Sequence, residues 1–133
     1  MSDLTYGYEK TLENETFDGA VRKVTEALMT EGFGVLTEID VRQTLKKKLD
    51  VDFRRYVIFG ACNPTLAGRA LEVEPQIGLL LPCNVVVQEA PGGGTTVSIA
   101  DPRVMFQLVG NPALEPVVKE AEARLRRVIE TLG

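Results

Sequence analysis

The sequence predicts an α+β fold in which helices pack on one face of a mainly antiparallel sheet. An early helical pattern is followed by consecutive strand-like segments and then by a late helical pattern, an order typical of this class. Two of the strand-like segments flank a glycine-rich turn at residues 90–94, which predicts a hairpin. The chain has 133 residues, 44% of them hydrophobic and 26% charged, so we expect one globular domain spanning residues 1–133.

The first half of the chain alternates strand and helix patterns. Residues 4–10 alternate in polarity and predict a strand. Thr16 is the expected N-cap of a helix that ends at Gly32. Residues 33–39 form a second β-rich run, and Asp40 is expected to cap a short helix. The apolar residues of that short helix share one face: Val41, Leu45 and Leu49.

The middle of the chain predicts a buried strand and a capped helix. Residues 55–62 are apolar on both faces, which is typical of a central strand. Asn63 and Pro64 follow as the expected N-cap and first residue of a helix. Pro75 is expected to terminate this helix.

The second half contains a hairpin and a long helix. Residues 77–89 are β-rich, but Pro82 lies inside the run and predicts a bulge, a break or a sheet edge. Residues 95–100 alternate cleanly and are the expected partner strand. A helical turn is expected after Asp101, and the last helix begins near residue 111.

The face of the sheet opposite the helices is expected to be partly apolar. We expect Tyr6 and Tyr8 there, together with Phe33 or Tyr56. Because an exposed apolar sheet face usually has a partner, the sequence predicts a homodimer.

The composition excludes several kinds of chemistry. The chain has no histidine, which removes Ser-His, Cys-His and histidine-ligated metal mechanisms, and two cysteines are too few for a four-sulfur zinc site. We therefore expect no metal and no cofactor. The formal charge of −4 makes nucleic acid an unlikely partner. The chain starts without a signal peptide pattern and has no apolar run of roughly 20 residues, so a cytoplasmic protein without a membrane segment is expected.

The most unusual feature is a repeated Cys-Asn pair. Cys62, Asn63 and Pro64 close one strand, and Cys83 and Asn84 follow Pro82 in another. If the strands are neighbours, two thiols and two amides converge on a candidate ligand site. Two alternatives stay open: Asn63 acts only as a helix cap and the cysteines pack in the core, or a low-pKa thiol at the helix N-terminus is a nucleophile.

A second feature of the sequence is the basic segment 42–55. It contains Arg42, Lys46, Lys47, Lys48, Arg54 and Arg55. Such a run is normally a solvated helix face, and an anion or nucleic-acid site is the alternative interpretation.

Three ordered motifs carry a resemblance to a known family. Residues 32–41 (GFGVLTEIDV), 60–64 (GACNP) and 77–87 (IGLLLPCNVVV) resemble the bacterial and archaeal family catalogued as domain of unknown function 302. The resemblance implies a TBP-like fold with the order β-α-β-β-β-β-α. It implies no catalytic residues, because the family has no established activity.

The function that the sequence favours is a non-catalytic, homodimeric domain that binds a small ligand or a partner. Cys62, Asn63, Pro64, Cys83 and Asn84 are the candidate binding residues. The first alternative is a thiol-dependent redox or enzymatic module that uses Cys62 and Cys83. The second is anion or nucleic-acid binding through residues 42–55.

Overall fold

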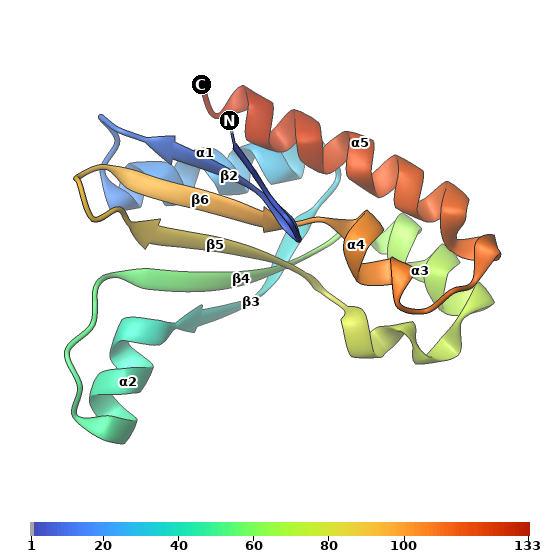
Figure 1. Ribbon diagram of the computed structural model, residues 1–133, viewed down its shortest axis with the longest axis horizontal. Helices are drawn as coiled ribbons and strands as arrows, with labels where there is room; N and C mark the ends of the chain where they lie inside the picture. Colours follow the sequence, from blue (N-terminus) through green and yellow to red (C-terminus); the bar gives the residue numbers. More distant parts are fainter. Residues whose placement is uncertain (1) are drawn as a thin grey trace.

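The computed structural model describes residues 2–133, which form a six-stranded antiparallel sheet (Figure 1). The strand order is β1-β2-β6-β5-β4-β3, and every neighbouring pair is antiparallel. The strands are β1 (Ser2–Leu4), β2 (Gly7–Leu12), β3 (Gly34–Asp40), β4 (Tyr56–Cys62), β5 (Cys83–Glu89) and β6 (Thr95–Ala100).

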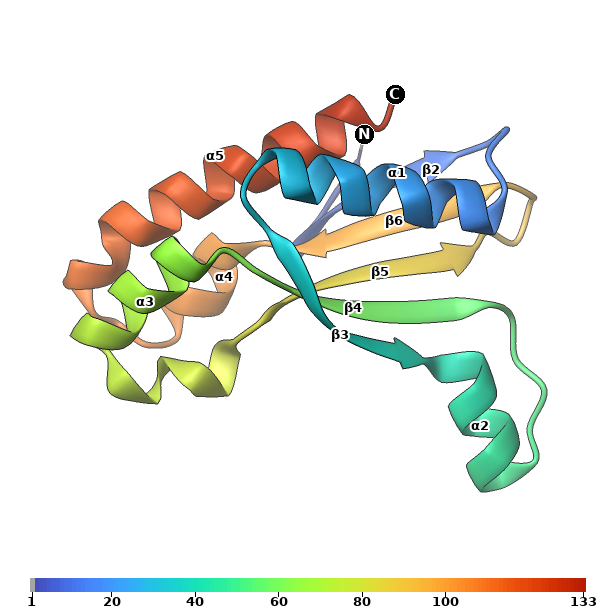
Figure 2. The same ribbon diagram turned by 180° about the vertical axis from the view of Figure 1, so that it is seen from behind.

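Two long helices cover one face of the sheet. These are α1 (Phe17–Thr30) and α5 (Glu115–Thr131), which pack against each other; Figure 2 shows α1 in front of the strands and α5 alongside it. With β1 and the short helices set aside, the order is β2-α1-β3-β4-β5-β6-α5. The predicted α+β fold class and element order are therefore confirmed. No helix in residues 2–133 is long and apolar enough to cross a membrane.

Shorter helices lie at the two ends of the strands. At one end, α2 projects beyond the sheet; at the other, α3, η1 and α4 gather beside α5 (Figures 1 and 2). Their bounds are α2 (Val41–Leu49), α3 (Pro64–Val73), η1 (Pro75–Leu80), α4 (Pro102–Gln107) and η2 (Pro112–Leu114). The two ends of the strands thus carry different helices: a single projecting helix at one end and a packed cluster of helices at the other.

The capping residues were predicted correctly because they act locally. Thr16 Oγ1 accepts a hydrogen bond from the Gly19 N–H at 3.0 Å, at the start of α1. Asp40 accepts one from the Gln43 N–H at 2.9 Å, at the start of α2. Such caps satisfy backbone donors that the first helical turn leaves unpaired.

The hydrophobic core lies between the sheet and the two long helices. The inward positions of β5 and β6 alternate along each strand, as a two-residue period requires. Val85, Val87 and Val97 are fully buried, and the facing helices contribute Val24 and Leu125. We call this covered side of the sheet the inner face and the opposite side the outer face.

Two aromatic residues that were expected on the outer face lie in the core instead. Tyr8 is buried, with the Arg126 guanidinium carbon 4.5 Å from its ring centroid, and Phe33 is also buried. Tyr6 does not share a face with Tyr8 because it lies in the turn between β1 and β2, which interrupts the alternation. Tyr56 does occupy an outer-face position, next to the inward-facing Val57.

Residues 77–82 form no strand. Pro75 follows the end of α3, as predicted, but it also begins η1, and β5 starts only at Cys83. A cis peptide bond joins Leu81 to Pro82 between these two elements. The strand prediction failed here because hydrophobicity alone does not distinguish a strand from a short helix.

Candidate functional site

The structure brings the two Cys-Asn pairs together at one end of the sheet. Cys62 is the last residue of β4, and Cys83 is the first residue of its neighbour β5. In the register of these strands, Ala61 pairs with Cys83 and Gly60 pairs with Asn84. Residues about twenty positions apart in sequence are therefore adjacent across an antiparallel ladder.

The two asparagines nevertheless lie in different surroundings. Successive side chains of a strand point to opposite faces, so Asn84 lies on the outer face whereas Val85 is buried on the inner face. Asn63 follows the last residue of β4 and caps α3. The expected convergence thus holds for the two strands, but the two amides do not share one pocket.

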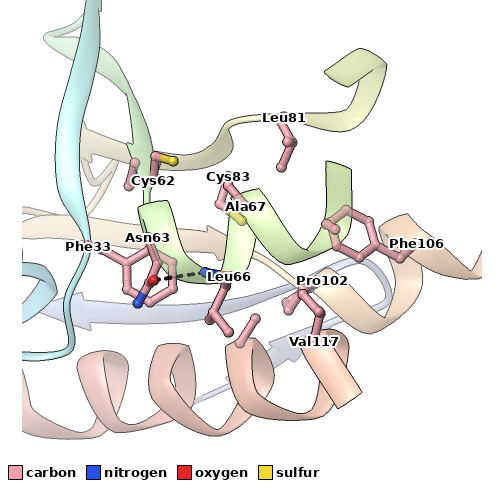
Figure 3. A pocket seen from close by; sticks show the side chains of 13 residues that line it. Phe33, Cys62, Asn63, Leu66, Ala67, Leu81, Cys83, Pro102, Phe106 and Val117 are labelled. Carbon is pink, nitrogen blue, oxygen red and sulfur yellow. Dashed lines mark hydrogen bonds between the residues drawn. The ribbon is translucent and has the colours of Figure 1, made fainter. Parts of the chain in front are cut away.

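The inner side of this sheet end holds a cavity of about 30 Å³. Both cysteines and Asn63 line it, together with apolar side chains from α3, α4 and α5 (Figure 3). Leu66, Phe106 and Val117 are among those apolar residues. A cavity of this volume holds about one water-sized molecule, so it is a packing defect of the core rather than a metabolite site.

Asn63 connects three helices. Its Oδ1 accepts a hydrogen bond from the Leu66 N–H at 3.1 Å, drawn as a dashed line in Figure 3. Its Nδ2 donates to the Glu31 carbonyl oxygen at 3.5 Å, and the same oxygen accepts from Arg124 Nη1 at 2.8 Å. Asn63 thereby fixes the start of α3 relative to the end of α1 and to α5.

A glycine makes this contact possible. Gly32 has a φ of +84°, and a Cβ added there would lie 2.9 Å from Asn63 Nδ2. A side chain at this position would therefore be strained and would also displace the amide. The helix-ending Gly32 that the sequence indicates thus has a second role beside the site.

Burial raises the pKa of both thiols. The pKa of Cys62 lies above its usual value because of burial, and burial together with the nearby Cys62 raises the pKa of Cys83 to about 11. The expectation of a low-pKa thiol at the N-terminus of α3 is wrong. Pro64 has no N–H to offer a thiolate, and the Leu66 N–H is already bonded to Asn63. Both thiols are therefore protonated at neutral pH.

The outer side of the same sheet end holds a larger cleft of about 150 Å³. Asn84 and Ala100 line it from the sheet, and both occupy outer-face positions. Four residues line both the cleft and the inner cavity and so separate them: Leu81, Cys83, Pro102 and Phe106. Asn84 is exposed, and within residues 2–133 its side chain makes no hydrogen bond.

A second glycine shapes the cleft. Gly60 pairs with Asn84, and a Cβ at Gly60 would lie 2.6 Å from Pro82 Cγ. The missing side chain lets Pro82 lie directly against β4. The Gly-Ala-Cys-Asn-Pro motif therefore combines a close backbone approach with the helix cap.

The remaining candidate residues contribute less. Pro64 is the exposed first residue of α3 and lines neither the cavity nor the cleft. Leu79, Met105 and Phe106 also line the cleft. No sequence pattern indicated that α4 reaches the Cys-Asn strands. Within residues 2–133, no group of three or more Cys, Asp or Glu side chains could hold a metal ion.

Much of the basic segment is engaged by nearby groups. Lys46 forms ion pairs with Asp50 at 2.9 Å and with Asp52 at 3.4 Å. The Arg54 guanidinium stacks 4.4 Å from the centre of the Phe53 ring. The segment nevertheless keeps a solvent-facing helix, since α2 has no buried residue.

Comparisons with known proteins agree with this architecture. No curated protein matches the sequence. A crystal structure of an uncharacterised conserved DUF302 protein from Bacillus stearothermophilus is similar, with a TM-score of 0.86 and 29% sequence identity. The similarity covers 96% of this chain and 98% of that one. The model of the family described as domain of unknown function DUF302 matches residues 8–132, so this chain belongs to the DUF302 family.

Proposed function

We propose that this protein is a non-catalytic, homodimeric binding domain of the cytoplasm that takes a small ligand in the outer cleft. The ligand has an apolar body and one hydrogen-bonding group of the amide or carboxylic acid type. The observation that carries the proposal is the exposed, unbonded amide of Asn84, the one amide or charged side chain among the residues that line the cleft.

The cleft has the composition of a small-molecule site. Such sites are mostly apolar and orient their ligand with a few polar groups. Leu79, Leu80 and Met105 supply apolar surface, and Asn84 supplies both a donor and an acceptor. A carboxamide or a carboxylic acid can use both at once, which makes these groups the best match.

The setting of the thiols favours binding over catalysis. A nucleophilic cysteine needs a lowered pKa, but burial raises the pKa of both Cys62 and Cys83. Cys83 instead forms part of the wall between cavity and cleft. The pair therefore acts as apolar lining rather than as reacting groups.

The outer face supports the homodimer. In residues 2–133 no long helix covers this face, as the view in Figure 1 shows. An apolar row crosses it, because Ile39 pairs with Ile58 and Ile58 pairs with Val86. Ile39 is 49% exposed, so an apolar strip remains available for a second copy.

Titration with isobutyramide tests the ligand site. In a ¹⁵N-labelled protein, we expect shifts of the backbone amide signals of residues 79–84 and 102–106. Asn84→Ala is expected to weaken binding by about tenfold, the effect of losing one hydrogen-bonded pair. Ser98→Ala changes an outer-face position of the neighbouring strand β6. It is the matched control and leaves the affinity unchanged. Shifts outside these two segments, or equal affinity of Asn84→Ala, would contradict the proposal.

A further inference from the structure

The exposed apolar side chains of the molecule gather around the projecting helix. Five of the twelve exposed large hydrophobic residues lie on β3 and in α2 with the segment after it. They are Val35, Leu36, Ile39, Leu49 and Val51. We call residues 41–55 the arm; its helix α2 projects beyond the sheet in both Figure 1 and Figure 2, whereas Arg55 at its end bonds to Glu89 and Asp18 of the body. Apolar side chains exposed on a projecting element are typical of an interaction surface.

The arm differs in charge from the rest of the chain. It holds six basic and two acidic residues, whereas the rest holds nine basic and seventeen acidic ones. The arm therefore has a formal charge of about +4 and the rest about −8, by the usual ionisation at neutral pH. The partner that suits the arm is both apolar and acidic.

This chain carries such a surface at its opposite end. Around α3 and η1, Leu71 is 43%, Val73 41% and Leu79 83% exposed. Residues 64–80 hold two acidic side chains, Glu72 and Glu74, against one basic side chain, Arg69. Leu79 also lines the outer cleft. The acidic, apolar end and the basic, apolar arm lie at opposite ends of the strands (Figure 1).

We propose that the arm of one copy docks on the α3–η1 end of a second copy and closes the outer cleft that carries Asn84. This inference rests on the homodimer of the proposed function and assigns its interface. Each cleft is then completed by residues of the other chain, with Leu49 and Val51 over Leu79 and the lysines of α2 facing Glu72.

A two-fold axis along the apolar row of the outer face produces this arrangement. The row crosses the strands, so such an axis stacks the outer faces and reverses the strand direction between copies. Ile39, Ile58 and Val86 then each face their own counterpart. The arm follows Asp40 at one end of the strands, and the cleft lies beside Asn84 at the other. The reversal therefore places each arm at the partner's cleft.

The charge distribution favours a second copy over a nucleic acid or an anionic membrane. A polyanion would meet the arm but would also be repelled by the acidic remainder of the chain. Val41 and Leu45, the apolar side of α2, are already half-buried, so this helix has no wide apolar stripe to insert into lipid. A copy of the chain instead matches charge and hydrophobicity in both directions.

Cross-linking of mixed copies tests the interface. Equal amounts of ¹⁴N- and ¹⁵N-labelled protein are treated with a carbodiimide, which joins amines directly to carboxylates, and the linked peptides are identified by mass spectrometry. We expect mixed-isotope links from Lys46, Lys47 or Lys48 to Glu72 or Glu74. Light scattering on the untreated protein reports the oligomeric state independently.

Charge-reversal variants of the arm test its docking on the partner separately from the existence of the dimer. Simultaneous Lys47→Glu and Lys48→Glu is expected to raise the dimer dissociation constant at least tenfold, and the effect should shrink in high salt. Lys119→Glu, the same exchange at one exposed position on α5, leaves the dimer intact. Circular dichroism confirms that each variant is folded.

The outcomes are distinct. A dimer whose arms link to other sites, or that tolerates the double reversal, overturns the docking inference and leaves the homodimer standing. A protein that stays monomeric at all concentrations overturns both. A monomer whose arm binds a single-stranded oligonucleotide or phosphatidylserine vesicles assigns the arm to another partner and also rejects the inference.

Discussion

The two Cys-Asn pairs have the same sequence but opposite surroundings. Asn63 is 8% exposed and hydrogen-bonded on the inner side, whereas Asn84 is exposed and unbonded on the outer side. The inner side has a cavity for about one water molecule, and the outer side has a cleft five times larger. The first pair therefore lies within the hydrogen-bonded contacts of the fold, whereas the second combines a buried thiol with an exposed amide, the group that the proposed function uses.

The largest difference between the two sides is expected from leucine truncation. Leu66→Ala on the inner side should lower the free energy of unfolding by about 2–5 kcal/mol, because it enlarges a buried cavity. Leu79→Ala on the outer side removes an 83% exposed side chain and should change it by less than about 0.5 kcal/mol. Urea unfolding of both variants measures the contrast, and equal losses would show that both sides are core.

Asparagine truncation should give a smaller contrast. Asn63→Ala removes the N-cap of α3 and its bond to the Glu31 carbonyl, so a loss of about 1–2 kcal/mol is expected. Asn84→Ala should cost less than about 0.5 kcal/mol, because its amide has no partner to lose. Denaturant midpoints provide the measurement. If Asn84→Ala were the more destabilising change, the amide would be structural and the cleft would lose its polar group.

Alkaline pH tests the burial of the Cys83 thiol, which lies in the wall between the inner cavity and the outer cleft. Its pKa is about 11 in the folded protein against an ordinary 9.0, so the folded state binds the thiol proton more tightly than the unfolded state. This contribution is complete below pH 9.0 and is lost as the pH rises toward about 11. At about pH 10 the loss is on the order of 1 kcal/mol.

A cysteine variant isolates this effect from other alkaline titrations. Cys83→Ala should flatten the decline of unfolding free energy between about pH 9 and pH 11 relative to the unmodified protein. Cys62→Ala is the control and should flatten it less, because burial and the neighbouring thiol act most strongly on Cys83. Identical slopes for all three proteins would place Cys83 in contact with solvent.

The helix caps and the long helices could be predicted because their signals are local. A hydroxyl, carboxylate or amide before a helix acts on backbone groups two or three residues away, so Thr16, Asp40 and Asn63 could be recognised from their neighbours alone. Helical spacing likewise identified the faces that α1 and α5 bury. Strand alternation was reliable along β6 from Val97 to Ala100, whereas Thr95 and Thr96 are both buried.

Predictions that depended on an uninterrupted alternation failed. The turn at Tyr6 moved Tyr8 to the core, and η1 replaced the expected start of the strand before Pro82. In both places one break in the backbone changes the face of every residue that follows. The residue types of these segments are compatible with either conformation, so sequence patterns do not decide between them.

The sequence by itself determined the order of the main elements, the caps Thr16, Asp40 and Asn63, and the Cys-Asn pair that closes β4. That Cys83 begins a strand rather than interrupting one was decided by the tertiary structure. Only the tertiary structure decided that β4 and β5 are neighbours, that α4 closes the cleft, and that Asn63 and Asn84 lie on different sides. The physical reason is that caps and periodic patterns depend on contacts within a few residues. The neighbours across a sheet and the environment of a side chain depend on packing between segments far apart in the chain.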